Sequence, residues 1–196
     1  ALFEHPTIDE LARAVEQARV ASRVAATVSI PRAVRPERLP LSYAQRRLWF
    51  LESLQERTGL FQIPFALRLC GQLDVPALAD SFRDLIRRHE LLRTSLHSAR
   101  GEPYQVVHEQ VAFELPVVDL SKGGVAADLG ELESRGFDLA EQPLLRARLL
   151  RVAGDQHVLL VVLHHLISDA WSATLAMREL SELYRARVSG HAPQLV

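Results

Sequence analysis

The sequence predicts a mixed α/β fold, in which helices flank a mixed sheet around one core. Segments with helical and with strand periodicity alternate along its 196 residues, in the order helix, strand, helix, several strands, helix, two strands, helix. The clearest strand is HVLLVVLHH, residues 157–165, whose almost continuous apolar run is typical of a central strand buried on both faces. The stretch LLRARLLRV, residues 144–152, alternates instead, as in a strand with one buried face.

The first forty residues are organised differently. Thr7 and Glu10 form a capping box, and apolar residues then recur at helical spacing, so residues 1–19 are expected to contain one amphipathic helix of roughly four turns. A single helix of that length is not stable alone in water. Residues 20–40 hold three prolines and several arginines without a sustained period, which predicts an extended linker. The main domain is therefore expected at residues 41–196.

Capping and turn residues divide the main domain into elements. Ser42 and Gln45 form a second capping box, Asp74 caps a later helix, and Pro116 restricts its strand to a sheet edge. The expected elements are a helix at 42–54, a strand at 61–71, a helix at 75–89, a hairpin at 93–109, an edge strand at 113–120, a short helix at 125–135 and a closing helix at 171–187.

Composition argues against several classes of function. The formal net charge of −1 is not the basic balance of a nucleic-acid-binding protein. No apolar run approaches the roughly 20 residues of a membrane span, and the first residues lack the features of a signal peptide. The single cysteine, Cys70, excludes an internal disulfide and fits a cytoplasmic protein. Because Cys70 lies in an alternating apolar run, we expect its side chain to be buried.

The buried run ends in HHLISDAWS, which carries the candidate chemistry. Rigid folds place reactive groups on loops at strand ends. Adjacent strand residues face opposite sides of a sheet, so only one of His164 and His165 can serve a given cleft. Three interpretations remain: a metal site, which would need further converging ligands, two structural histidines, or a general base with an imidazole near its ordinary pKa of about 6.5. Ser168 or Asp169 could cap the helix that follows, and in the last case Asp169 would orient the histidine or pair with an arginine.

Two further stretches stand out. RRHELLRT runs from a helix end into a strand, and arginines at a helix C-terminus complement its dipole, which accounts for Arg87 and Arg88 but not for Arg93. SYAQRRLWF, residues 42–50, is explained equally well as an amphipathic helix with aromatic core anchors.

These three stretches resemble the condensation domains of nonribosomal peptide synthetases. LSYAQRRLWFL is similar to the family's opening motif S-x-A-Q-x-R-L-W-F-L, RHELLRTSL to R-H-E-x-L-R-T-x-F, and LHHLISDAWS to the H-H-x-x-x-D-G signature. They occur in family order between residues 41 and 188. The segment LFEHPTIDELA resembles the end of a peptidyl or acyl carrier domain, without the serine that would bear phosphopantetheine.

The resemblance implies a fold like that of chloramphenicol acetyltransferase, with two lobes around a channel. Residues 41–196 would be the amino-terminal lobe, with the carboxy-terminal lobe absent, and residues 1–19 the remnant of a carrier domain. The implied reaction is amide formation, in which the amine of an acceptor aminoacyl thioester attacks a donor thioester. Upstream and downstream carrier domains would deliver both phosphopantetheine arms, beside an adenylation domain of the same synthetase. This chain would bind no metal or cofactor of its own, and alone it would be inactive.

The resemblance also assigns roles to single residues. His165 takes the catalytic position and His164 a structural one. Asp169 would hold the geometry of the site through an arginine, for which Arg93 is the first candidate and Arg88 the second.

Three residues would border the substrate channel: Ala170, Trp171 and Ser172. Alanine at 170 replaces the family's usual glycine, and its methyl group would narrow the entrance and disfavour a positive φ. The motifs favour the subtype that accepts an L-configured donor. Two alternatives stay open: a non-catalytic module that docks carrier domains, and an epimerisation domain, which shares the fold and motif but deprotonates Cα.

Overall fold

The computed structural model describes residues 4, 7–22, 34–36, 38–54, 59–120 and 124–195, in two compact units, Ala1–Arg35 and Pro36–Val196. In the first unit, helix α1 (Ile8–Ser22) begins at the predicted capping box. The Thr7 hydroxyl accepts from the Glu10 N–H at 3.3 Å, and the Thr7 N–H donates to the Glu10 carboxylate at 3.2 Å. The helix continues past residue 19, and residues 23–33 of the predicted linker lie outside the described residues.

The described part of the second unit confirms the predicted mixed α/β class and the order of its main elements. They are β1 (Leu39–Pro40), α2 (Tyr43–Ser53), β2 (Gln62–Cys70), α3 (Val75–Arg88), the 3₁₀ turn η1 (Glu90–Arg93), β3 (Thr94–Ala99), β4 (Glu102–Val107), β5 (Val117–Asp119), α4 (Val125–Ser134), β6 (Leu145–Ala153), β7 (Gln156–His164) and α5 (Ala170–Ser189).

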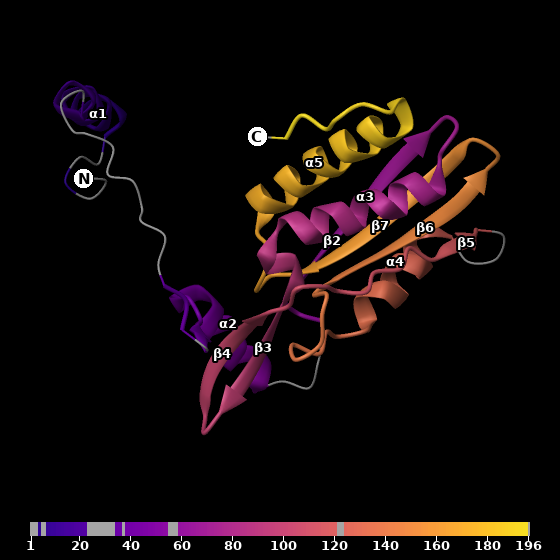
Figure 1. Cartoon of the computed structure of the whole chain (residues 1–196). Helices are drawn as coiled ribbons and strands as arrows, with labels where there is room; N and C mark the ends of the chain where they lie inside the picture. The colour runs from indigo at the N-terminus through magenta and orange to yellow at the C-terminus, as the bar shows by residue number, and fades with distance from the viewer. Residues whose placement is uncertain are drawn as a thin grey trace. The chain divides into compact units, whose positions relative to one another are not determined.

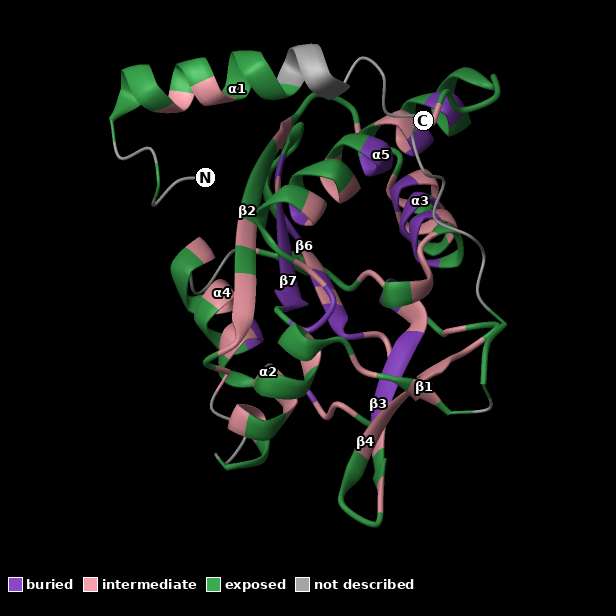
Figure 2. Cartoon of the chain, turned by 90° about the vertical axis from the view of Figure 1, so that its left-hand side faces the viewer, coloured by how far each residue is buried: buried purple, intermediate pink, exposed green. Residues whose placement is uncertain are grey.

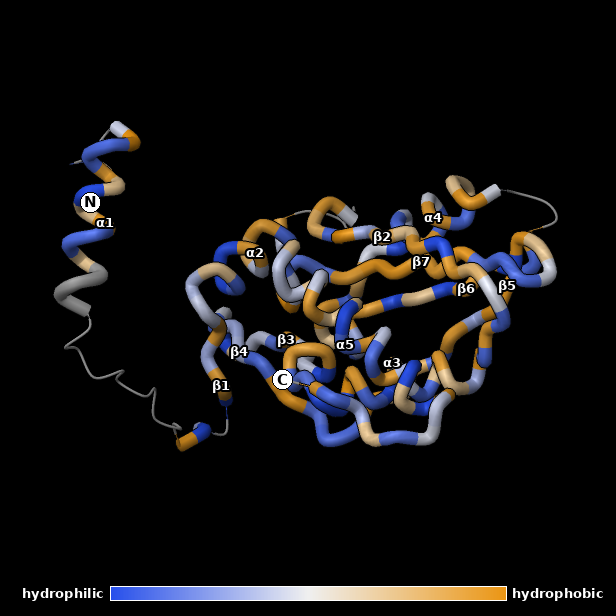
Figure 3. Tube along the Cα trace, turned by 90° about the horizontal axis from the view of Figure 1, so that it is seen from above, coloured by the Kyte–Doolittle hydropathy of each residue, from blue (hydrophilic) through white to orange (hydrophobic). Residues whose placement is uncertain are grey.

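The strands form two sheets. The larger has the order β2-β7-β6-β5, in which β7 runs antiparallel to both neighbours and β5 runs parallel to β6. The smaller has the order β1-β4-β3 and contains the predicted hairpin. Helices α3 and α5 lie side by side on one face of the larger sheet, and α4 lies on the other (Figures 1 and 3). This sandwich fixes where strand β7 ends.

Strand β1 lies inside the segment predicted to be a linker. Leu39 and Pro40 pair with Gln105 and Tyr104 of β4, and the Gln105 side chain donates to the Pro40 carbonyl at 2.9 Å. A two-residue strand has no periodicity to reveal it, and proline is tolerated there because β1 is an edge strand.

The core is centred on β7, as the continuous apolar run predicted. The side chains from Leu159 to Leu163 are at most 1% exposed, and β7 is drawn almost entirely as buried between its neighbours (Figure 2). Above it, Phe82 of α3 is fully buried and stacks on Phe113 with ring centroids 4.9 Å apart. Apolar burial of this extent is the main force that holds the helices to the sheet.

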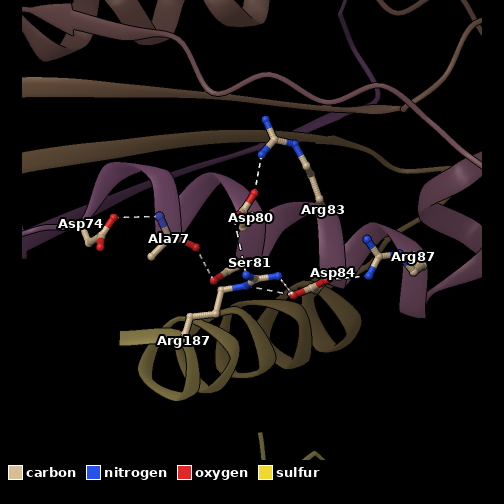
Figure 4. Close-up of polar contacts among 8 residues, drawn as sticks. All are labelled: Asp74, Ala77, Asp80, Ser81, Arg83, Asp84, Arg87 and Arg187. Carbon is tan, nitrogen blue, oxygen red and sulfur yellow. Dashed lines mark hydrogen bonds and ion pairs between the residues drawn. The ribbon is translucent and has the colours of Figure 1, made fainter. Parts of the chain in front are cut away.

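Polar contacts between the two helices join α3 to α5 (Figure 4). Arg187 of α5 donates through Nε to Asp84 at 3.0 Å and lies 3.4 Å from Asp80, both on α3. Asp74 caps α3 as predicted, accepting from the Ala77 N–H at 2.9 Å. The three carboxyl-bearing residues belong to one helix and its cap, and Arg187 ties the middle of that helix to the end of α5.

Cys70 was expected to be buried, and this expectation is wrong. Its side chain is exposed, because Cys70 is the last residue of β2, an edge strand whose alternation does not reach a covered face there. No helix among the described residues is long and apolar enough to cross a bilayer.

We predict that core packing outweighs the polar network between α3 and α5. Phe82→Ala should lower the free energy of unfolding by about 3–5 kcal/mol, because it removes a fully buried ring and leaves a cavity. Arg187→Ala, the control on the same helix pair, should cost less than about 1 kcal/mol, because its ion pairs are partly exposed. Urea unfolding midpoints of the two variants measure the difference, and equal losses would contradict it.

Candidate active site

The turn after β7 places two adjacent histidines in opposite environments. The His164 side chain is 1% exposed and faces the core, whereas His165, the first residue of the turn, is exposed. Backbone hydrogen bonds hold the turn. Within it, the Ile167 N–H donates to the His164 carbonyl at 3.1 Å, and the His165 N–H donates to the carbonyl of Phe61, just before β2, at 2.8 Å. The histidines therefore differ in burial because the chain leaves the sheet between them.

His164 is held in one protonation state. Its Nδ1 accepts from the Leu166 N–H at 3.1 Å, so the ring proton of the neutral imidazole lies on Nε2. The Phe137 ring meets the imidazole edge-on, at 5.8 Å and 85°. Burial, and to a lesser degree the neighbouring His165, lowers the pKa of His164 to about 4. At pH 7 this side chain is neutral.

His165 opens onto a groove of about 630 Å³. One wall comes from α2 with Gln45 and Leu48, and another from the turn into α5 with Trp171 and Ser172. Trp171 is 83% exposed, so a large aromatic surface borders the groove beside the imidazole. Leu91 and Gln105 complete the lining from η1 and β4. The groove is thus built from all three stretches that the sequence singled out, together with β4.

Among the described residues Asp169 pairs with no arginine, which corrects the expectation. It is the N-cap of α5: its carboxylate accepts from the Ser172 N–H and the Ser172 hydroxyl, each at 2.7 Å, and the Asp169 N–H donates to that hydroxyl at 2.8 Å. These hydrogen bonds lower the pKa of Asp169. The carboxylate at this position accepts a hydrogen bond from a free N–H in the first turn of its own helix, so it is engaged locally.

The two arginines expected as its partners are engaged elsewhere. Arg93 donates to the His108 carbonyl at 2.5 Å and lies 3.6 Å from the Glu90 carboxylate. Arg88 donates to Glu179 at 3.2 Å, and His89 lies 2.6 Å from the same carboxylate. The Glu179 side chain is 8% exposed, so these groups compensate a carboxylate that α5 buries.

Ala170 does not border the groove and is not strained. It is the first residue of α5, and Arg100 is the only non-glycine residue in the described part of the chain with a positive φ. Trp171 and Ser172 line the groove, whereas Ala170 does not. Because position 170 starts a right-handed helix, alanine fits the backbone there, and the expected strain does not arise.

Sequence reasoning missed the contribution of α2 to the turn. The Gln45 side chain donates to the Leu166 carbonyl at 3.4 Å, and Glu52 lies 3.8 Å from Nε2 of His164. Gln45 belongs to the opening motif, so the sequence could have indicated its role. Glu52 lies outside the motif, and no sequence pattern indicated that it contacts His164.

The aromatic residues of α2 divide between core and surface. The interpretation of residues 42–50 as a helix with aromatic core anchors holds for Trp49, which packs against the core, but not for Phe50, which is 55% exposed. Among the residues that the structure describes, no three His, Cys, Asp or Glu side chains are grouped to hold a metal ion.

We predict that burial of His164 makes the fold less stable in mild acid. Its pKa is about 4 when folded and 6.5 when unfolded, so below pH 6.5 the unfolded chain binds the proton more readily and stability falls. The loss should reach about 3 kcal/mol near pH 4. His164→Asn, which keeps an acceptor for the Leu166 N–H, should lack this slope in urea unfolding between pH 7 and 4. His191→Ala, at an exposed position, should retain it, and an unchanged slope in His164→Asn would refute the assignment.

We also predict that the negative charge of Asp169 stabilises the fold at neutral pH and that this stabilisation is lost in acid. Its pKa is lowered in the folded state, so the stabilisation is complete above the ordinary value of 3.8 and is lost as pH falls through the lowered pKa. Asp169→Asn keeps the cap without the charge. Its unfolding midpoint should lie below that of the wild type at pH 7 and converge with it in acid, once the Asp169 carboxylate is protonated in the folded state, while Asp169→Ala should lie lower at both pH values. A constant gap between wild type and Asp169→Asn would contradict this account.

The family model of the condensation domain matches residues 36–196. The chain is 38% identical over 195 residues to the dimodular nonribosomal peptide synthase of Bacillus subtilis (strain 168), a match that covers 98% of this chain and 8% of that protein. It is 37% identical over 188 residues to bacitracin synthase 2 of Bacillus licheniformis, a match that covers 95% of this chain and 7% of that protein. The chain thus spans a small part of the curated relatives it matches.

Solved structures agree with the sequence matches. The X-domain from teicoplanin biosynthesis aligns with a TM-score of 0.78 at 34% identity, over 86% of this chain and 37% of that one. The starter condensation domain of the rhizomide synthetase RzmA aligns with a TM-score of 0.75 at 21% identity, over 82% of this chain and 40% of that one. These likenesses confirm the predicted fold, which is related to chloramphenicol acetyltransferase. With its family model, its relatives and its fold in agreement, the chain belongs to the condensation-domain family of nonribosomal peptide synthetases.

Proposed function

We propose that this chain supplies one side of a site that forms amide bonds between two carrier-bound thioesters, with His165 as the catalytic residue. The observation that carries the proposal is the exposed imidazole of His165 in a groove of about 630 Å³, while the adjacent His164 is sealed in the core. The relative named as a peptide synthase and the match to the condensation-domain model support the reaction class.

The reaction requires little beyond positioning and a proton acceptor. The acceptor amine attacks the thioester carbonyl carbon, a C–N bond forms, and the C–S bond breaks to release the donor arm as a thiolate. The amine proton becomes acidic as the bond forms, and the neutral imidazole of His165 accepts it or hydrogen-bonds the amine into line. The protonated imidazole then returns the proton to the leaving sulfur. No covalent enzyme intermediate is needed because the thioester is already activated.

The partners follow from the substrates. Upstream and downstream carrier domains would deliver the donor and acceptor on phosphopantetheine arms, and a second lobe would close the groove in the full-length protein. The solved X-domain supports the second lobe, because this chain covers only 37% of it. The N-terminal segment would belong to a preceding carrier domain, on the resemblance of LFEHPTIDELA. The match to the dimodular synthase covers 98% of this chain and so includes residues before 36, where the condensation-domain model begins.

Another candidate function is a docking module without catalysis. It is favoured by one observation: the similarity, at 33% identity and a TM-score of 0.78, to an X-domain that is in a complex with OxyB from teicoplanin biosynthesis. In that case the surface of the lobe, and not His165, would carry the function.

Replacement of His165 separates the two candidates. In the full two-lobed domain with loaded donor and acceptor carriers, His165→Ala should lower the rate of amide formation by about 10²–10⁴-fold. Single-turnover assays with L- and D-configured donors would measure this loss and test the proposed preference for the L-donor. His191→Ala, an exposed histidine far along the chain, is the matched control and should leave the rate unchanged.

Two results would count against the catalytic proposal. An undiminished rate in His165→Ala excludes this imidazole as proton acceptor. A domain that forms no amide with any donor, yet binds a partner protein of the same synthetase, favours the docking module.

A further inference from the structure

A nearly buried carboxylate on α2 faces the base of the histidine turn. The Glu52 side chain is 11% exposed, and its Oε1 lies 3.8 Å from Nε2 of His164. Burial raises the pKa of Glu52, so the environment opposes its charge. Burying the Glu52 carboxyl costs free energy that a side chain pointing to solvent would not cost. The buried position therefore calls for a compensating interaction.

The hydrogen bond on the other side of the imidazole determines what Glu52 meets. Since Nδ1 accepts from the Leu166 N–H, the ring proton is on Nε2 and points to the side where Glu52 lies. The Nε2 atom is buried and has no hydrogen-bond partner among the described residues. The separation of 3.8 Å exceeds the usual length of an N–H···O hydrogen bond by about 1 Å, so Glu52 faces Nε2 without bonding to it in this structure.

The same helix also holds the far side of the turn. Gln45, two turns before Glu52 on α2, donates to the Leu166 carbonyl at 3.4 Å. The Leu166 backbone is thus held at both of its polar groups: its N–H by His164, which Glu52 faces, and its carbonyl by Gln45. Helix α2 therefore contacts both His164 and the residue that follows His165.

We propose that Glu52 is a positioning residue, which holds His164 in its Nε2–H tautomer and thereby fixes the turn that presents His165. The structural part of this proposal stands alone, and its kinetic consequence rests on the proposed function. The role needs an acceptor oxygen and no net charge, because a protonated carboxyl retains one acceptor oxygen. The imidazole also has His165 on the same turn and the Phe137 ring beside it, with Arg146 over that ring at 4.0 Å, and Gln62 pairs with His164 across β2 and β7. Among the described residues, the carboxylate within 4 Å of Nε2 is that of Glu52.

The tautomer can be measured on the chain itself. Two-bond ¹H–¹⁵N NMR correlations of the histidine rings should show His164 protonated on Nε2 in the wild type, and a proton on Nδ1 would overturn the proposal. In Glu52→Ala the Leu166 amide should exchange at least about tenfold faster with solvent, because the acceptor ring is less restrained. Glu52→Gln, which keeps an acceptor oxygen, should restore wild-type protection. Ser53→Ala, an exposed neighbour on α2, is the matched control and should leave the amide unchanged.

The kinetic test uses the full two-lobed domain. Glu52→Ala should lower kcat on the order of 10- to 100-fold while KM for the carrier-bound substrates stays within about twofold, because His165 is displaced and not removed. Glu52→Gln should recover most of the rate, which a loss caused only by a smaller side chain would not predict.

The two proposals fail in distinguishable ways. If His165→Ala leaves amide formation unchanged, the proposed function fails, and the NMR result for Glu52 still stands or falls alone. If His165→Ala abolishes the reaction while Glu52→Ala keeps both the wild-type rate and the wild-type protection of Leu166, the positioning role is refuted.

Discussion

The candidate site depends on the burial of strand β7 from Leu159 to His164. The strand is covered on one face by α3 and α5 and on the other by α4, and it pairs on both edges with β2 and β6. A strand held in this way has no freedom to slip, because a shift of one residue would turn every side chain to the opposite face. The position of the last strand residue, His164, is therefore set by the whole core, and the chain can leave the sheet only at the next residue.

The helix that follows is bound to this geometry by local hydrogen bonds. Asp169 and Ser172 satisfy each other's backbone groups, and the cap stands four residues after His165. From that start the helix crosses the sheet to Arg187, which α3 binds through Asp84. The loop of residues 165–169 is thus short, with the buried end of β7 before it and the cap of α5 after it. Short loops on a fixed scaffold suit a side chain that must meet a substrate in one orientation.

The acidic residue of the signature shows how a role can be misread when only its residue type is known. Asp169 could orient an imidazole, pair with an arginine or cap a helix, and all three are compatible with a carboxylate in that place. The structure shows the cap, because the free N–H of Ser172 is nearer than any described guanidinium. Arg88, a basic residue of the second motif, serves Glu179, a buried carboxylate on α5, and so its contribution to the site is indirect.

The sequence by itself determined the fold class, the central strand, the helix caps and the segment with the candidate chemistry. These are local properties: a continuous apolar run reports burial on two faces, and capping residues mark helix starts whatever surrounds them. Tertiary structure alone decided that Cys70 is exposed, that two linker residues join a sheet and that Glu52 meets His164. Each of these depends on which surfaces of distant segments meet, and no periodicity in one segment encodes the identity of its neighbour.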